Sequence, residues 1–308
     1  MNFKNLDIST YMYNIFQVLS YKHFKGWGRK KTGRFALWCY KKFRGTVTLQ
    51  EDGFIRSVGL GVNGSPSFSL VEDDIGIYYD ASSSSKLENI LNDYDFANDT
   101  KLMDDARRAI DLVVKQKISK YNNAPNIDEN YFKTDEERVL VIAQTQGDTS
   151  LEYGMLDNFT TDDMLNAALS DNPKSKIYLK IHPDVLSGKK KSDIDIESAK
   201  KICIIIDEDV NPLSLLKYFS KVYTKTSGMG FEALLVGCEC VCFGMPFYAG
   251  WGVTDDRSKC ERRKRKCSVE EIFAAAYILY TRYYNPYTKK ESDIFDTIDT
   301  IVKMRNVV

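Results

Sequence analysis

Histidine, paired cysteine and long apolar runs are scarce in this sequence. It has two histidines and seven cysteines, and no two cysteines form a CxxC pair, so a structural zinc site is not expected. The odd cysteine count and an alternating CECVC stretch at 238–242, which is typical of a buried strand, indicate reduced thiols and a cytoplasmic protein. No apolar run approaches the ~20 residues that cross a bilayer, and we expect no targeting segment.

A net charge of either sign is also lacking. The 43 lysine and arginine residues balance 43 aspartate and glutamate residues, so we expect no nucleic acid partner. Residues 26–45 nevertheless interleave basic residues with tryptophan and phenylalanine. This pattern fits either an amphipathic helix with a solvated face or an anion-facing surface. The 19 tyrosines and 16 phenylalanines leave room for peripheral contact with a membrane.

The first part of the chain, up to an Asn- and Pro-rich linker at 122–130, mixes helical and strand patterns. We predict a mostly helical region at 1–45, a strand at 46–50, a hairpin at 67–82, a serine-capped helix after it and a long helix at 100–121. The predicted domains are 1–130, 131–284, and a helix within 285–308 that crosses back to the first domain.

Five short apolar runs after the linker are separated by stretches of helix length, which predicts a parallel α/β sheet. The runs lie at 138–144, 176–183, 201–207, 220–228 and 238–244. Each is followed by an unusual polar or glycine-rich cluster. Because ligands of such sheets bind beyond the carboxyl ends of the strands, we predict a site there.

Two of these clusters contain candidate catalytic side chains. Asp148 lies in QTQGDTS, where it could cap the next helix or act as a base or nucleophile. Gln144 begins that segment and is a candidate substrate-binding residue. His182 and Lys180, in KIHPD, could contact a phosphate or carboxylate, although His182 could equally be a buried structural histidine.

The next two clusters suggest a shaped anion site. TKTSGMGFE joins a strand to a helix, and its spacing differs from that of a Walker A loop or a dinucleotide fingerprint. Thr226, Ser227 and Gly228 are candidate phosphate contacts, and Glu232 could accept hydrogen bonds from a ribose diol. The aromatic and glycine residues of GMPFYAGWG should wall a pocket, with Tyr248 and Trp251 as candidates for substrate contact.

An earlier stretch, EDGFIRSVGLG at 51–61, gathers Glu51, Asp52 and Arg56 before two glycines. It could be a charged turn with an internal Glu–Arg pair or part of a binding site.

Taken in order, these motifs resemble the bacterial capsule-polysaccharide β-Kdo transferases of the KpsC/KpsS type. The stretches that carry the resemblance are EDGFIRSVGLG, SFSLVEDDIGIYYDA, QTQGDTS, KIHPD, TSGMGFEALLVG, GMPFYAGWGVTDDR and AAAYILYTRYYNP. The resemblance runs from about residue 26 to residue 288. Many family members have two such modules in tandem where this chain has one, and alanine often follows the aspartate where this chain has Thr149.

The resemblance implies a GT-B-like fold, with two Rossmann-like domains facing across a cleft. It implies a retaining glycosyltransferase that takes Kdo from CMP-Kdo and adds it to a lysophosphatidylglycerol-based glycolipid with a Kdo linker. Such enzymes work in the cytoplasm at the inner face of the inner membrane, beside capsule assembly and export proteins. We expect no cofactor or metal, because a helix N-terminus, a histidine and a lysine can stabilise a departing monophosphate.

The resemblance also implies roles for individual residues. Asp148 matches the catalytic aspartate, which would form a covalent Kdo adduct, and His182 and Lys180 would lie near the CMP phosphate. Arg56 would pair with a Kdo carboxylate, and Glu51 or Asp52 would orient or deprotonate a sugar hydroxyl. Two alternatives stay open: another CMP-sugar transferase, such as a sialic acid type, and a non-catalytic glycolipid-binding module of a capsule assembly complex.

Overall fold

The computed structural model describes residues 6–132, 136–155, 157–181, 185 and 192–305. The chain divides into two compact units, each with its own sheet. The first unit consists of Met1–Ala109, Lys120–Asn123 and Phe273–Val308, and the second of Ile110–Ser119 and Ala124–Ile272. The predicted boundaries put residues 273–284 in the second domain. They pack instead with the first unit, because they contribute to strand β10 (Thr281–Asn285) of that unit's sheet.

The first unit has a mixed sheet in the order β1-β2-β3-β10-β11. Its parallel pair is β1 (His23–Trp27) with β2 (Thr46–Asp52), and helix α2 (Lys31–Phe43) connects these two strands. All other neighbouring strands are antiparallel. The three further strands are β3 (Ser69–Asp73), β10 (Thr281–Asn285) and β11 (Lys290–Ser292).

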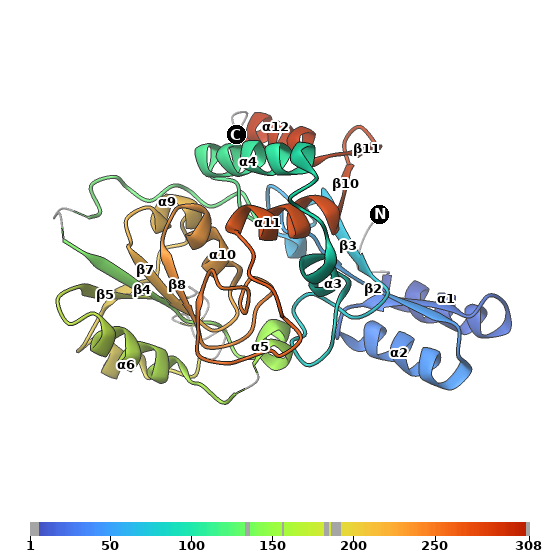
Figure 1. The fold of residues 1–308 in the computed structure, drawn as a ribbon, viewed down its shortest axis with the longest axis horizontal. Helices are drawn as coiled ribbons and strands as arrows, with labels where there is room; N and C mark the ends of the chain where they lie inside the picture. The colour runs from blue at the N-terminus through green and yellow to red at the C-terminus, as the bar shows by residue number, and fades with distance from the viewer. Residues whose placement is uncertain (1–5, 133–135, 156, 182–184, 186–191, 306–308) are drawn as a thin grey trace. The chain divides into compact units, whose positions relative to one another are not determined.

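Helices α1 and α2 pack against each other and against β1 (Figure 1). Helix α4 begins in the first unit and ends in the second. The helical elements of the first unit that accompany α2 are α1 (Leu6–Leu19), the short 3₁₀ turn η2 (Gly61–Asn63), α3 (Lys86–Asp93), the first part of α4 (Thr100–Gln116), the π-helical segment η3 (Ala274–Leu279) and α12 (Ile294–Arg305).

Strand β1 interrupts the region that was predicted to be mostly helical. Its side chains alternate between intermediate and buried, with Phe24 and Gly26 on the buried side. A Cβ atom at Gly26 would lie 2.4 Å from the carbonyl oxygen of Thr32, so glycine lets α2 pack closely on the strand. Five residues with only two inward positions are too short for periodicity to separate strand from helix.

The hairpin predicted at 67–82 is also wrong, because only its first strand, β3, forms. The carboxylate of Asp73, at the end of β3, accepts hydrogen bonds from the backbone N–H groups of Ile75 and Gly76 at 2.9 and 2.8 Å. It also accepts from the N–H of Lys86 and the hydroxyl of Tyr280, at 2.9 and 2.8 Å. This buried carboxylate holds the chain as a loop where the turn composition suggested a second strand.

The second unit confirms the predicted parallel sheet. All five predicted strands form, a sixth short strand follows them, and every neighbouring pair is parallel. The order β6-β5-β4-β7-β8-β9 is the doubly wound order of nucleotide-binding α/β folds. The strands are β4 (Arg138–Ile142), β5 (Lys176–Lys180), β6 (Ile204–Ile206), β7 (Lys221–Thr224), β8 (Glu239–Cys242) and β9 (Asp255–Asp256).

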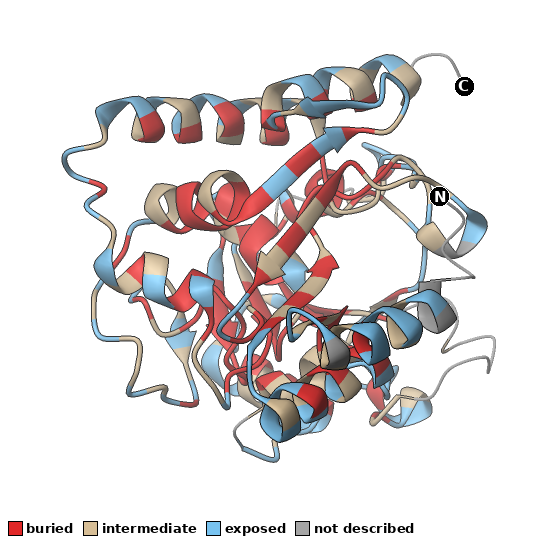
Figure 2. Cartoon of the chain, turned by 90° about the vertical axis from the view of Figure 1, so that its right-hand side faces the viewer, coloured by how far each residue is buried: buried red, intermediate tan, exposed pale blue. Residues whose placement is uncertain are grey.

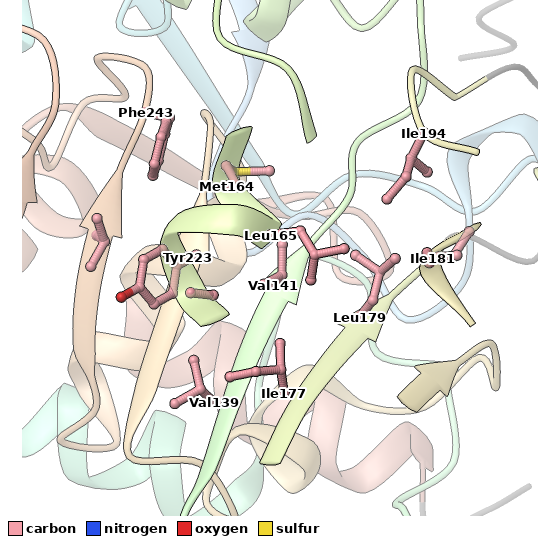
Figure 3. Close-up of a cluster of buried hydrophobic side chains, with 13 residues drawn as sticks. Val139, Val141, Met164, Leu165, Ile177, Leu179, Ile181, Ile194, Tyr223 and Phe243 are labelled. Carbon is pink, nitrogen blue, oxygen red and sulfur yellow. The ribbon is translucent and has the colours of Figure 1, made fainter. Parts of the chain in front are cut away.

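Apolar side chains cover both faces of this sheet, which explains the continuous apolar runs in its sequence. Every residue of β4 is buried. Figure 3 shows one face, where Met164 and Leu165 of α6 pack over Val139 and Val141. The helices of this unit are the end of α4, α5 (Thr149–Gly154), α6 (Thr161–Asp171), α8 (Ile196–Ala199), α9 (Pro212–Leu216), α10 (Gly228–Leu235) and α11 (Val269–Phe273), whose last residue lies in the first unit.

All seven cysteines are free thiols. Over the residues that the structure describes, no helix has the length and apolar content needed to cross a membrane.

Figure 2 shows how buried residues concentrate along the strands, whereas the helices alternate between buried and exposed positions.

Candidate active site

The carboxyl ends of β4 and β7 mark the point where the strand order of the second sheet reverses. Gln144 lies just beyond β4, and Thr226 lies just beyond β7. The side-chain oxygen of Gln144 accepts from the Thr226 backbone N–H at 2.8 Å, and its amide nitrogen donates to Thr226 Oγ1 at 3.0 Å. The structure thus brings two predicted site residues together at the place where open α/β sheets bind ligands.

Asp148 lies in the loop that leaves β4, and its side chain is exposed. It is the N-cap of α5 and accepts a hydrogen bond from the Ser150 backbone N–H at 2.9 Å. Ser150 Oγ lies 3.0 Å from Thr226 Oγ1, so this cap connects Asp148 to the Gln144–Thr226 pair. Asp148 therefore has the helix-capping role that the sequence left open. Because its carboxylate is also exposed, it remains accessible to a substrate.

Helix α10 begins beside the same pair. Ser227 is its N-cap and accepts from the Met229 backbone N–H at 3.2 Å. A Cβ atom added at Gly228 would meet no atom within 4 Å, so the space at the first residue of the helix is open. Free backbone N–H groups and the helix dipole make such an end a favourable place for an anion.

Glu232 lies one turn into α10 and is buried, with 8% of its surface exposed. Burial raises the pKa of this carboxyl to about 7, against the opposing effect of a hydrogen bond from Ser119 Oγ. The group therefore changes charge near neutral pH. Ser119 lies 113 residues earlier in the sequence, and no local pattern there marks it as a partner.

Lys180 ends β5, and its ammonium donates to the backbone carbonyls of Glu208 and Ile181 at 2.9 and 3.3 Å. Burial lowers its pKa, and the acidic residues that follow β6 oppose that effect. Its neighbour in the sequence motif, His182, lies outside the residues that the structure describes.

The glycine-rich loop after β8 folds inward on its aromatic side chains. Tyr248 is fully buried and donates to the Ser227 carbonyl at 2.6 Å, beneath the start of α10. Trp251 is 1% exposed and donates to the Phe247 carbonyl at 2.9 Å. The guanidinium carbon of Arg263, a residue that follows this loop, lies 5.7 Å from the Trp251 ring centroid. Tyr248 and Trp251 therefore shape the loop from within.

Sequence reasoning missed Lys225, which lies directly after β7. It is 4% exposed and forms an ion pair with Asp193. Burial acts to raise the pKa of Asp193, but hydrogen bonds from Lys225 and Thr161 hold it below its ordinary value. The only signal in the sequence was the position of Lys225 next to Thr226, at a strand end.

In the first unit, Arg56 is buried and used internally. Its Nε lies 2.9 Å from Asp52 Oδ2, and its Nη1 donates to Ser57 Oγ at 2.9 Å. A Cβ atom at Gly61 would come within 2.4 Å of the guanidinium, so this glycine packs against Arg56. The internal pair left open by the sequence therefore forms, with Asp52 as the partner and not Glu51.

Glu51 points to the buried side of β2 and is 7% exposed. Its Oε1 lies 3.5 Å from the Lys30 ammonium. Lys120, which sequence reasoning also missed, is held beside this region because its carbonyl accepts from the Arg56 backbone N–H at 3.0 Å. Burial acts to lower the pKa of Lys120, but two tyrosines and the carboxylates of Glu51 and Asp52 raise it overall.

The two units define an α/β protein of the GT-B-like fold class, in which the sheet of the second unit is Rossmann-like and that of the first is mixed, contrary to the expectation of two Rossmann-like domains. The family model described as "Capsule polysaccharide biosynthesis protein" matches residues 26–283. The chain therefore belongs to the capsule polysaccharide biosynthesis protein family.

Two sequence relatives are similar over much of the chain. The capsule polysaccharide modification protein LipA of Neisseria meningitidis serogroup A is 41% identical over 296 residues, which are 91% of this chain and 41% of LipA. The lipopolysaccharide-processing protein LpsZ of Rhizobium meliloti is 40% identical over 76% of this chain and 53% of its own length. The chain thus spans about half the length of these relatives or less.

Two solved structures from Thermosulfurimonas dismutans are also similar. The KpsC β-Kdo 2,4 transferase superposes with a TM-score of 0.84 at 46% identity and covers 91% of this chain and 86% of its own. The KpsC β-Kdo 2,7 transferase gives a TM-score of 0.71 at 30% identity, with 92% and 85% covered.

Proposed function

We propose that this chain is a retaining β-Kdo transferase of capsule polysaccharide biosynthesis that uses CMP-Kdo as donor. The observation that carries the proposal is the group formed by Gln144, Thr226 and the exposed Asp148 at the switch point of the second sheet. This group occurs in a chain that is 46% identical to a KpsC β-Kdo 2,4 transferase. That similarity exceeds the similarity to the 2,7 enzyme and supports a 2,4 linkage as the product.

The donor would lie along the carboxyl ends of the second sheet. The N–H groups at the start of α10, with Ser227 and Gly228, would receive the phosphate, helped by Lys180 and His182. Glu232 would accept a hydrogen bond from the ribose. These groups supply enough positive potential for a single departing phosphate, so the reaction is proposed to need no metal.

The chemistry would be a double displacement. The Asp148 carboxylate would attack the anomeric carbon of Kdo as the bond to CMP breaks, which leaves a Kdo–Asp ester. An acceptor hydroxyl would then displace Asp148 and lose its proton to a base, for which Glu51 is the candidate. Arg56 already forms an ion pair with Asp52. We therefore propose that Arg56 acts on a sugar indirectly, by holding the Asp52 carboxylate that contacts it.

The acceptor would be a lysophosphatidylglycerol-based glycolipid with a Kdo linker. This acceptor requires work at the inner face of the inner membrane, in association with capsule assembly and export proteins. A transferase that meets such an acceptor must approach the lipid surface without a spanning helix of its own in the described part of the chain.

Intact-mass measurement after mixing the protein with CMP-Kdo tests donor and nucleophile together. We expect a one-Kdo adduct in the wild type and none in Asp148→Asn, because asparagine keeps the helix cap but is a poor nucleophile. Asp148→Ala should abolish transfer while CMP still binds.

Asp195→Asn is the matched control, because Asp195 caps α8 through a hydrogen bond from the Glu197 N–H at 3.1 Å. It should leave the adduct unchanged. Near-normal turnover by Asp148→Ala would disprove the mechanism. Protection by CMP-sialic acid, without protection by CMP-Kdo, would point to a different donor.

A further inference from the structure

Large apolar side chains are exposed together on α1 and α2. On α1, Met12, Ile15 and Phe16 are 46%, 49% and 62% exposed, and their spacing puts them on one side of the helix. On α2, Trp38 is 50% exposed. We call these four residues the apolar face. Isolated exposed apolar residues are ordinary, whereas such a group on two packed helices indicates a binding surface.

A single buried side chain fixes the orientation of α1. The amide of Asn14 accepts from the Lys25 backbone N–H at 2.8 Å and donates to the Lys25 carbonyl at 2.7 Å, along the outer edge of β1. Because successive helical residues are rotated by about 100°, Met12 and Phe16 point almost opposite to Asn14. The anchor to the sheet therefore turns the apolar side chains of α1 outward.

Aromatic contacts join the two helices. The ring of Phe35 on α2 lies 5.1 Å from Tyr11 on α1 and 5.8 Å from Trp38. The Lys42 ammonium lies 5.4 Å from the Trp38 ring centroid. Trp38 is thus held between an aromatic neighbour and a cation, in the mixed setting that tryptophan occupies at membrane interfaces.

The stretch of chain that contains the apolar face is strongly basic. Residues 8–50 contain nine lysine and arginine residues and no aspartate or glutamate, in a chain whose total charge is zero. A second copy docked through the same face would bring an equal set of cations against these, so charge opposes a symmetric dimer. An anionic partner is favoured. The exposed cations are Lys22, Lys30, Lys31, Arg34, Lys41, Lys42 and Arg44.

We propose that the apolar face and its surrounding cations dock the protein on an anionic phospholipid bilayer. Helix α1 has 14 residues, or about 21 Å, and would lie flat in the interface with Ile15 and Phe16 inserted among the headgroups. The basic side chains would contact the lipid phosphates. The purpose of this docking, access to a membrane-borne acceptor, rests on the proposed function. The binding to lipid itself needs neither donor nor acceptor.

Co-sedimentation with vesicles tests this surface. The wild type should bind vesicles of phosphatidylcholine mixed with phosphatidylglycerol and not vesicles of phosphatidylcholine alone. Ile15→Ser should weaken binding about fivefold, by the loss of one inserted side chain. Ile75→Ser, at a loop position with the same 49% exposure, is the matched control and should bind like the wild type.

Lys41→Glu with Lys42→Glu should weaken binding by about thirtyfold or more, because each basic residue near an anionic surface contributes about one factor of five. Equal binding to both kinds of vesicle, or unchanged binding by both sets of variants, would overturn the proposal. So would a lipid-free dimer that Ile15→Ser dissociates. Lipid binding without Kdo transfer would refute the proposed function and leave the docking surface standing.

Discussion

Glu232 is a side chain whose charge near neutral pH depends on its surroundings. Removal from water favours its neutral form, and the hydrogen bond from Ser119 only partly restores the charged one. A carboxyl that titrates near pH 7 could donate a hydrogen bond to a ligand when protonated and accept one when ionised. Ligand affinity at this position should therefore vary with pH across the neutral range.

The same group makes stability pH-dependent. Its pKa rises from 4.5 to about 7 on folding, so between these values the folded state holds a proton that the unfolded state has released, and stability falls as pH rises. The loss should reach up to ~3 kcal/mol by pH 8. Between pH 5 and pH 8, urea unfolding should show the stability of Glu232→Gln rising relative to that of the wild type by about 2–3 kcal/mol, because part of the loss has already occurred at pH 5. A difference that is the same at both pH values would contradict the pKa shift.

From the sequence it was possible to predict which residues lie at strand ends, but not in which direction their side chains point. Gln144 and Thr226 could be predicted as strand-end residues because parallel strands end at one edge. Nothing local distinguishes Tyr248, which turns into the core, from an aromatic residue that lines a pocket. Arg56 could not be assigned either, because its partner depends on how the following loop folds back on it.

At the scale of elements, Asp73 holds together the end of β3, the loop after it and the start of α3. Asp73→Ala would leave two loop N–H groups, the Lys86 N–H and the Tyr280 hydroxyl without their acceptor. We expect a loss of about 3–5 kcal/mol in the free energy of unfolding, measured by denaturant titration.

Tyr280→Phe is the companion variant, because it removes only one of these hydrogen bonds. It should cost about 1–2 kcal/mol. Equal losses for the two variants would mean that Asp73 acts through Tyr280 and does not organise the loop.

Elements were predictable in proportion to their periodicity. The five parallel strands of the second sheet are buried on both faces and appear as uniform apolar runs, which few other structures produce. The strand β1 and the loop that replaced the hairpin lack such a pattern. Asp73, which holds the loop, also accepts a hydrogen bond from Tyr280, which lies 207 residues away, and local sequence contains no record of that contact.

For the whole molecule, the sheet of the first unit depends on both ends of the chain. A fragment of residues 1–123 contains β1, β2 and β3 but lacks β10, which pairs with β3. The exposed edge of β3 should leave this fragment unfolded or aggregated. Residues 110–272 hold the complete second sheet and should fold alone. Circular dichroism with thermal unfolding of both fragments tests this, and cooperative unfolding of fragment 1–123 would contradict it.

The pairing of β10 with β3 also sets an order of events at the ribosome. The strands of the second sheet, from residue 138 to residue 256, are all made before β10 at 281–285 emerges. The unit that begins first should therefore be completed last, which reverses the usual N-terminal-first order of folding during synthesis. Until then β3 presents a free edge, and the nascent chain would need protection by chaperones between the synthesis of β3 and that of β10.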